Sequence, residues 1–442
     1  MALVSTNNNN NMSVHESSSR NKNAHNNQKH MAATATTKRR MKRLKKSVSS
    51  VSYKSSTGSV ASTHTHDSSD FKSCGFAPLV TSSVMLAMEH FDDMLDNIPT
   101  TNNKNKNNHI MSVNRNELHR ISLLGSGACS NVYLVVVADY EKNDIQKLAL
   151  KCLDPLRLQG PDDFLSAATD LAMEASTLSQ LEPHENIIRL RGVCSTRFSQ
   201  SFGELGVDCS TEGYFLLLDC LTETLSDRLD RWRKDRRSVG GAGATAGIFR
   251  KLSHLTHCSK HPQHLDLSKL YGRIETCAIG IASGMAHLHK SGIVMRDLKP
   301  SNVGFDESGI VRIFDFGMAR SVQNCNPDEM CGSARYMSPE AMAGHGYSLK
   351  SDVYSFGILL FELCTLQVPF EDDLPKNATL QDFQKLVVEE GLRPSSKVLE
   401  RIPCAKTRSL IQRCWHTDPN SRPSFEEILQ TLKHIVQQQQ EQ

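Results

Sequence analysis

The chain has 442 residues, and 38% of them are hydrophobic, which is enough for a core in one part of the chain but leaves other parts without one. The net charge of +3 is uneven: residues 1–66 hold eleven Lys and Arg and one acid, a net of +10, so the remainder carries 3 − 10 = −7. The lack of a run of about 18 apolar residues argues against a membrane-spanning protein, and thirteen scattered Cys favour reduced thiols and a cytoplasmic or nuclear localisation.

A polar, basic segment opens the chain. Residues 1–112 are rich in Asn, Ser and Thr and cannot bury enough apolar surface to offset their chain entropy, so they are predicted to be a disordered arm. Within them, residues 38–46 form a cluster of Lys and Arg. Such a cluster is typical of a segment that binds a nuclear import receptor or a nucleic acid, and it is equally typical of a solvated charge run.

One apolar pattern interrupts this arm. Val84, Met88, Phe91 and Leu95 are spaced at i, i+4, i+7 and i+11, which places them on one face of a helix. Three interpretations remain open: the helix docks a partner, packs back on the rest of the chain, or forms transiently without a role.

The composition changes at about residue 113. Alternating apolar residues and turns continue to about residue 220, and long helical periodicities follow. A strand-rich part before a helix-rich part predicts an α+β fold with two unlike lobes, 113–220 and 221–437. Residues 231–268 are expected to form an inserted surface loop, and residues 438–442 a Gln-rich tail.

A glycine-rich turn lies between two apolar strands of the first lobe. Gly125, Ser126 and Gly127 form the turn, and Val132 belongs to the strand that follows. Glycines let a backbone approach phosphates closely and donate its amides to them. Because simple hairpins contain similar turns, this motif alone is a weak indication.

Lys151 and Glu174 strengthen the indication. Lys151 lies in an apolar strand, where an ammonium group is costly to bury unless it is paired. Glu174 lies on a helical pattern together with Leu171 and Leu178, and it is the expected partner. With the turn, the two residues are interpreted as a phosphate clamp.

The strongest segment begins at Ile293. It contains Asp297, Lys299 and Asn302, and a short apolar strand then leads to Asp315. A proton acceptor, a cation and two metal-binding groups thus lie close together in the sequence. Phosphoryl transfer requires these parts, since its loose transition state needs in-line positioning and charge neutralisation more than covalent help.

This set of motifs resembles the eukaryotic protein kinase catalytic domain, over residues 113–437. The resemblance implies a bilobal kinase-like fold, with a small β-rich N-lobe and a larger helical C-lobe. It also implies ATP and Mg²⁺ as cofactors and protein substrates as partners.

The resemblance implies roles for the site residues. Lys151 would hold the α- and β-phosphates of ATP and pair with Glu174. Asp297 would accept or orient the substrate proton, with Lys299 near the γ-phosphate. Mg²⁺ would be held by Asn302 and Asp315.

It also implies an adenine site and a closing set of structural residues. Leu218 would be the gatekeeper, followed by a hinge that includes Asp219 and Leu221. Glu340 would form a buried ion pair with Arg422. The residues near the end of the domain, Trp415, Asp418, Pro419, Arg422 and Pro423, are most similar to those of the tyrosine-kinase-like group of Ser/Thr kinases.

Two residues depart from the family pattern. Met295 stands where the family has His, and it can fill the volume but cannot supply the hydrogen bond, so we expect some loosening of the magnesium loop. Ser130 stands in place of the third glycine. These departures are the only support for an alternative, a pseudokinase scaffold that binds nucleotide or partners without catalysis.

The segment between Gly317 and Glu340 contains no Thr. Arg296 would ordinarily pair with a phosphate there. We hypothesise that Asp328 or Glu329 supplies this negative charge. The sequence therefore predicts an active protein kinase, and Lys299, two residues after the base, favours Ser/Thr over dual specificity.

Overall fold

The computed structural model describes residues 76, 79–101, 110–139, 144–203, 213–239, 266–326, 329–375 and 377–441. Within this range, the residues of Phe71–Val137 and Gln146–Gln442 form one compact unit. The other unit comprises Met1–Asp70 and Ala138–Ile145. The structure describes only residues 138–139 and 144–145 of it. The basic cluster at 38–46 lies outside the described residues.

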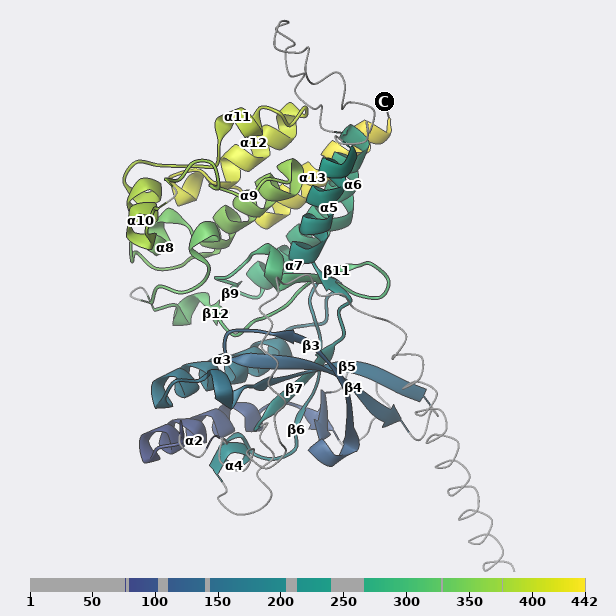
Figure 1. The fold of residues 1–442 in the computed structure, drawn as a ribbon, viewed down its shortest axis with the longest axis vertical. Helices are drawn as coiled ribbons and strands as arrows, with labels where there is room; N and C mark the ends of the chain where they lie inside the picture. Colours follow the sequence, from purple (N-terminus) through teal and green to yellow (C-terminus); the bar gives the residue numbers. More distant parts are fainter. Residues whose placement is uncertain are drawn as a thin grey trace, which may run out of the picture. The chain divides into compact units, whose positions relative to one another are not determined.

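A seven-stranded sheet, in the order β1-β2-β6-β7-β5-β4-β3, forms the N-lobe (Figure 1). Strand β2 pairs in parallel with both β1 and β6, whereas the β6–β7, β5–β7 and β3–β4 pairs are antiparallel. The strands are β1 (Thr100–Thr101), β2 (Ile110–Val113), β3 (Leu118–Ser126), β4 (Ser130–Asp139), β5 (Asp144–Leu153), β6 (Leu190–Cys194) and β7 (Phe215–Asp219).

Strand β5 shows how the sheet places a charge in the cleft. Leu148, Leu150 and Cys152 are buried in a small cluster on one face of the sheet. Ala149 and Leu153 are buried in the main core on the other face. Because side chains alternate along a strand, Lys151 lies on the face of Ala149 and Leu153.

The C-lobe is mostly helical. Helix α9 is its centre, since every residue from Ser351 to Thr365 is buried. Small sheets pair β8 (Glu223–Thr224) and β11 (Val311–Ile313) with β10 (Val303–Phe305), and β9 (Ile293–Val294) with β12 (Arg320–Ser321). The helices of both lobes are α2 (Ser82–Asp96), α3 (Pro161–Gln180), α4 (Phe198–Gly203), α5 (Leu225–Val239), α6 (Leu267–Arg273), α7 (Ile279–Lys290), α8 (Pro339–Met342), α9 (Leu349–Thr365), α10 (Leu380–Val388), α11 (Ser396–Leu399), α12 (Ala405–Cys414) and α13 (Phe425–Gln440).

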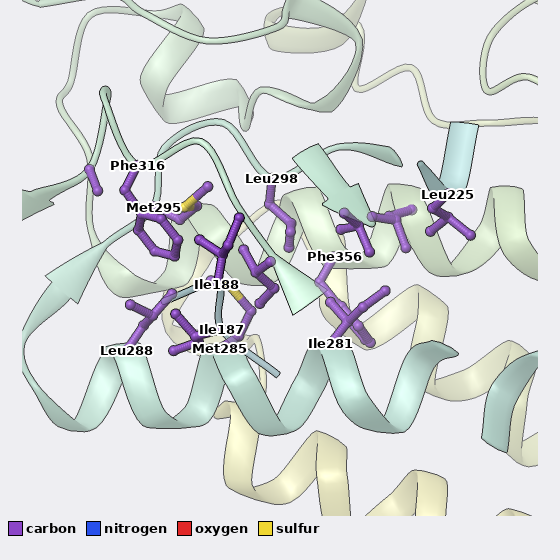
Figure 2. Packing of buried hydrophobic residues seen from close by; sticks show 14 of the residues in the cluster. Ile187, Ile188, Leu225, Ile281, Met285, Leu288, Met295, Leu298, Phe316 and Phe356 are labelled. Atoms are coloured by element: carbon purple, nitrogen blue, oxygen red, sulfur yellow. The ribbon is translucent and has the colours of Figure 1, made fainter. Parts of the chain in front are cut away.

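The core of the C-lobe packs against the segment that carries Met295 and Leu298. Figure 2 shows Ile281, Met285 and Leu288 pointing from α7 toward the segment that carries Met295 and Leu298. All five side chains are fully buried. The predicted two-lobe arrangement, with a strand-rich first lobe and a helical second lobe, is confirmed. No helix among the described residues combines the length and the apolar character needed to cross a membrane.

Three predicted boundaries were wrong. The arm was predicted to be disordered to residue 112, but α2, β1 and most of β2 lie within that range, because their apolar residues are buried against the N-lobe. The insert was placed at 231–268, but α5 continues to Val239 and α6 begins at Leu267. The tail was placed at 438–442, but α13 continues to Gln440.

Candidate functional site

Lys151, Glu174 and Asp315 meet between the two lobes. The Lys151 ammonium donates to Glu174 Oε2 at 2.6 Å and to Asp315 Oδ1 at 2.7 Å. The Glu174 side chain is 1% exposed, and its Oε1 accepts from the backbone amide of Phe316 at 3.3 Å. Strand β5, helix α3 and the segment after β11 are therefore joined through one cation, as the sequence predicted for the Lys151–Glu174 pair.

The electrostatics of this group fit an ion-paired arrangement. Burial alone would lower the pKa of Lys151, but the adjacent Asp315 and Glu174 carboxylates raise it overall. The Lys151 ammonium lowers the pKa of Asp315 in turn. These carboxylates therefore favour the charged form of the Lys151 ammonium. A charged ammonium is what the resemblance to kinases requires of a residue that holds the phosphates of ATP.

The Asp297 carboxylate accepts three hydrogen bonds from neighbouring groups. Its Oδ2 accepts from Lys299 Nζ at 2.6 Å and from Asn302 Nδ2 at 3.0 Å, and its Oδ1 accepts from the amide of Ser333 at 2.9 Å. Lys299 also donates to the Ser333 hydroxyl at 2.8 Å. The carboxylate is 6% exposed and held in one orientation, which suits a group that must meet a substrate hydroxyl.

A glycine turn makes the Ser333 contact feasible. Gly332 has φ +95°, and a Cβ there would lie 2.6 Å from the carbonyl oxygen of Arg296. Only glycine combines that conformation with that close approach. The turn therefore brings the segment around Ser333 against residues 295–302, here called the catalytic loop.

The catalytic loop is anchored from α9 through Asp352. This fully buried carboxylate accepts from the amides of Met295 at 2.8 Å and Arg296 at 2.9 Å, and it lies 3.0 Å from His289 Nε2. Arg296 and Asp315 both have left-handed backbone conformations, with φ 65° and 67°. Such conformations are costly for non-glycine residues and persist only where surrounding bonds fix them, as they do here.

Met295 fills the position where the family has His. It is fully buried, and Figure 2 shows it beside Phe316 in the same cluster. The polar contacts of Asp297 and Asp315 are made without a side-chain bond from residue 295. The volume of the missing imidazole is thus occupied, and its absence leaves the polar network of the site intact.

Asn302 and Asp315 are suited to a hard divalent cation. The amide of Phe314 donates to the carbonyl of Asn302 at 3.0 Å, which brings the residue before Asp315 against Asn302. Asn302 Nδ2 faces Asp297, so its Oδ1 points elsewhere. The Asp315 side chain is 43% exposed and uses one oxygen for Lys151. Carboxylate and amide oxygens with room for phosphate oxygens fit Mg²⁺.

The phosphate loop has a tether that the sequence did not reveal. Arg157 Nη1 donates to the carbonyl of Gly127 at 2.6 Å, and Arg157 Nε pairs with Asp154 Oδ2 at 3.0 Å. Asp154 Oδ2 also accepts from Asn131 Nδ2 at 3.0 Å, and Asn131 Oδ1 accepts from Ser126 Oγ at 2.7 Å. The loop between β3 and β4 is therefore fastened to the loop between β5 and α3.

The other residues predicted to contact the nucleotide lie in the N-lobe sheet and just after it. Gly125 and Val132 pair across the β3–β4 hairpin. The carboxylate of Asp219, at the end of β7, pairs with Arg191 of β6 at 2.5 Å. The side chain of Asp219 therefore links two neighbouring strands of the sheet. Leu221 follows it and packs against the core, where Gly304 leaves room for its Cδ1.

Two further ion pairs support residues 317–340, here called the activation segment. Arg296 Nη1 meets Glu329 Oε2 at 2.8 Å, which agrees with the hypothesis that an acid replaces a phosphate, whereas Asp328 lies outside the described residues. Arg422, which is fully buried, holds Glu340 with two bonds of 2.7 and 2.8 Å, as predicted. The middle of the segment, at Glu329, and its last residue, Glu340, are thus fixed to the C-lobe.

Comparison with known proteins agrees with this geometry. Residues 118–432, more than half of the chain, match the family described as protein kinase domain. Serine/threonine-protein kinase STY46 of Arabidopsis thaliana is 37% identical over 162 residues, which cover 36% of this chain and 27% of that protein. Serine/threonine-protein kinase STY17 of the same plant is 33% identical over 162 residues, with the same coverage.

A probable serine/threonine-protein kinase of Dictyostelium discoideum is 40% identical over 162 residues, which cover 36% of this chain and 16% of that protein. The matched part is thus about a quarter or less of the length of these relatives. The resemblance to Ser/Thr kinases of the tyrosine-kinase-like group agrees with the two Arabidopsis relatives. The match over residues 118–432 shows that the chain belongs to the protein kinase domain family.

Proposed function

We propose that this protein is a serine/threonine kinase that transfers the γ-phosphate of ATP to Ser and Thr hydroxyls of protein substrates in intracellular signalling. The observation that carries the proposal is the fixed Asp297 carboxylate, with Lys299 2.6 Å from its Oδ2. The choice of Ser and Thr rests on Lys299 and on the names of the relatives.

The residues divide the work of phosphoryl transfer between them. Asp297 orients the substrate hydroxyl and takes its proton while the hydroxyl oxygen bonds to the γ-phosphorus. The bond from that phosphorus to the bridging oxygen breaks, and ADP leaves. Lys299 offsets the negative charge of the transferred group, and Lys151, held by Glu174, positions the phosphates of ATP. Asn302 and Asp315 would hold Mg²⁺, whose positive charge would offset the negative charge of the phosphate oxygens.

The alternative, a pseudokinase scaffold without catalysis, has less support than an active kinase. Its support is Met295 and Ser130. Met295 is buried within the core. Ser130 begins strand β4, and its carbonyl accepts from the amide of Gly127 at 2.7 Å, so the turn closes without a third glycine.

The test is transfer of radiolabelled γ-phosphate from ATP with Mg²⁺ to a generic protein substrate, followed by phosphoamino-acid analysis. The full chain should place label on Ser and Thr, and Asp297→Asn should place almost none. Equal labelling by both forms would remove the catalytic assignment. Label on Tyr alone would leave the kinase assignment intact and overturn the substrate class.

We further propose a cytoplasmic or nuclear location, with residues 38–46 as the segment that binds an import receptor or nucleic acid. The support is the basic composition of that segment and the free state of each cysteine that the structure describes. Replacement of its Lys and Arg by Ala should abolish nuclear accumulation of a fluorescent fusion. Unchanged accumulation, together with unchanged salt-dependent retention on nucleic acid, would reject both partners.

A further inference from the structure

Helix α2 precedes the kinase family match and is nonetheless built into the N-lobe. It begins at a Thr81 cap, whose hydroxyl accepts from the amide of Val84 at 3.3 Å. Val84, Met88, Phe91 and Leu95 are between 0% and 8% exposed. The stripe that the sequence left without a partner is packed on α3 and α4, which lie beside α2 in Figure 1.

Aromatic rings join the three helices. Phe164, in the first turn of α3, is fully buried and lies 5.1 Å from the ring of Phe202 in α4 and 5.6 Å from that of Phe76. On α2, Phe91 meets the ring of Phe198 edge-on at 5.6 Å. Aromatic pairs of this kind stabilise a fold by more than their buried apolar area alone would, and they have a preferred geometry. The cluster therefore fixes both the position and the angle of α3.

Polar contacts set the register of α2. Asp92 is 4% exposed and accepts from both the amide and the hydroxyl of Ser199 at the start of α4. Asp96, one turn later, pairs with Arg197. A buried carboxylate tolerates few alternative partners, so a shift of α2 along α4 would leave Asp92 unsatisfied.

The same extension is also fastened at its far end. Strand β2 pairs with β6, with Met111 opposite Gly192 and Val113 opposite Cys194, and β1 lies beyond β2 at the end of the sheet. The amide of Ser195 donates to the carbonyl of Val113 at 2.9 Å. Residues 79–101 and 110–113 thus hold the N-lobe from a helix layer and from a sheet edge.

Helix α3 is the link between this layer and the cleft. Helix α3 packs on α2, Phe164 meets the ring of Phe202 in α4, and Glu174 meets Lys151. The two residues are about 15 Å apart along the helix axis, at 1.5 Å per residue. Because a packed helix moves as a rigid body, a tilt at Phe164 displaces Glu174.

We propose that α2 is the element that holds α3 where Glu174 meets Lys151, so that turnover depends on residues outside the matched kinase domain. Met88 and Phe91 are then positioning residues that act through Glu174. This inference rests on the proposed kinase function.

The test compares Met88→Ala with Leu86→Ala in the full chain. Leu86 lies on the same helix but is 71% exposed, so its replacement is a matched control. Met88→Ala should lower kcat by about tenfold, the scale of effect that a misplaced group can have. Met88→Leu should restore it, and Leu86→Ala should leave it unchanged.

A second background separates positioning from general damage. In Glu174→Gln, the link to Lys151 is already weakened, so adding Met88→Ala should lower kcat little further. An equal fold-loss in both backgrounds, or an unchanged kcat for folded Met88→Ala, would overturn the inference. Phe91→Leu, a milder change, gives the same comparison if Met88→Ala does not fold. An inactive wild-type chain would count against the proposed function instead.

Discussion

The two sides of helix α3 are held by different kinds of interaction. On the cleft side, Glu174 meets the Lys151 ammonium, which also binds Asp315. On the outer side, Phe164 packs among aromatic rings, and α3 packs on α2, the helix that carries Met88. Paired charges depend on each partner being present, whereas an apolar layer depends on total volume and shape. Substitutions of the charged residues near Lys151 should therefore cause a large loss of kcat. Substitutions on the outer side of α3 should lower kcat by smaller amounts.

Among the substitutions around Lys151 and in the loops, the largest effect is expected for Asp315→Asn. The variant loses an anionic metal ligand and one partner of Lys151. Metal-ion stabilisation of a transferring phosphoryl group is worth several kcal/mol, so kcat should fall by about 10³-fold. Turnover measured over a Mg²⁺ titration checks this. A wild-type kcat at saturating Mg²⁺ would show that Asp315 does not hold the metal.

Lys151→Met should damage both activity and stability. It leaves Glu174, 1% exposed, without its cation, and the removal of one partner from a buried pair costs about 3–5 kcal/mol. Burial already raises the pKa of Glu174, and the substitution removes the ammonium that opposes this. The folded-state pKa then lies above the unfolded-state value, so stability is retained at low pH and lost as the pH rises through the folded-state pKa.

Urea unfolding of Lys151→Met at acidic and neutral pH measures this dependence. Lys147→Met is the control, because Lys147 lies on the same strand, is 46% exposed and pairs with the exposed Glu307. A loss of stability that is equal for both variants or independent of pH would contradict the buried-pair account.

Glu329→Gln probes the activation segment. Arg296 is fully buried and pairs with Glu329, so loss of the charge should lower kcat by about three- to tenfold. Wild-type protein treated with a phosphatase should keep its activity. Dephosphorylated protein without activity, which recovers only after phosphorylation within 318–337, would rule out an acid in place of a phosphate. Glu307→Gln, at an exposed acid, is the control.

Arg157→Ala should give the smallest effect. The substitution removes one bond to the carbonyl of Gly127 and one to Asp154. Both are partly exposed, so we expect the KM for ATP to rise by about two- to fivefold, with little change in kcat. The neighbouring Leu156→Ala, at a residue 70% exposed, should have no effect. An unchanged KM for Arg157→Ala would mean that the tether does not shape the phosphate loop.

The sequence predicted the cleft residues better than their surroundings. Burial of a charge requires a partner, so the sequence itself indicated the pairing of Lys151 with Glu174. The roles expected for Asp297 and Asp315 came from the resemblance to the kinase family. The apolar spacing of Val84, Met88, Phe91 and Leu95 indicated a helix. It did not indicate which element packs on that helix, because an apolar face can pack on many different partners.

Other features lacked any periodic signal. Asp154 and Arg157 lie in a short loop, where no repeat of side chains predicts a contact with the glycine-rich turn. The end of α5 was misread as a loop because its Arg and Lys residues resemble a solvated insert, yet Arg233 pairs with the buried Glu362. Tertiary contacts decided both cases.

The most direct test of the central claim is the rate of the chemical step in Asp297→Asn. A single turnover of bound radiolabelled ATP should slow by about 10²- to 10⁴-fold, since the variant lacks the proton acceptor. Its affinity for MgATP should stay within about twofold of wild type, because the resolved bonds of Asp297 join it to protein groups of the catalytic loop and to Ser333. An unchanged rate, or a rate loss that is matched by a loss of nucleotide affinity, would contradict the role of Asp297.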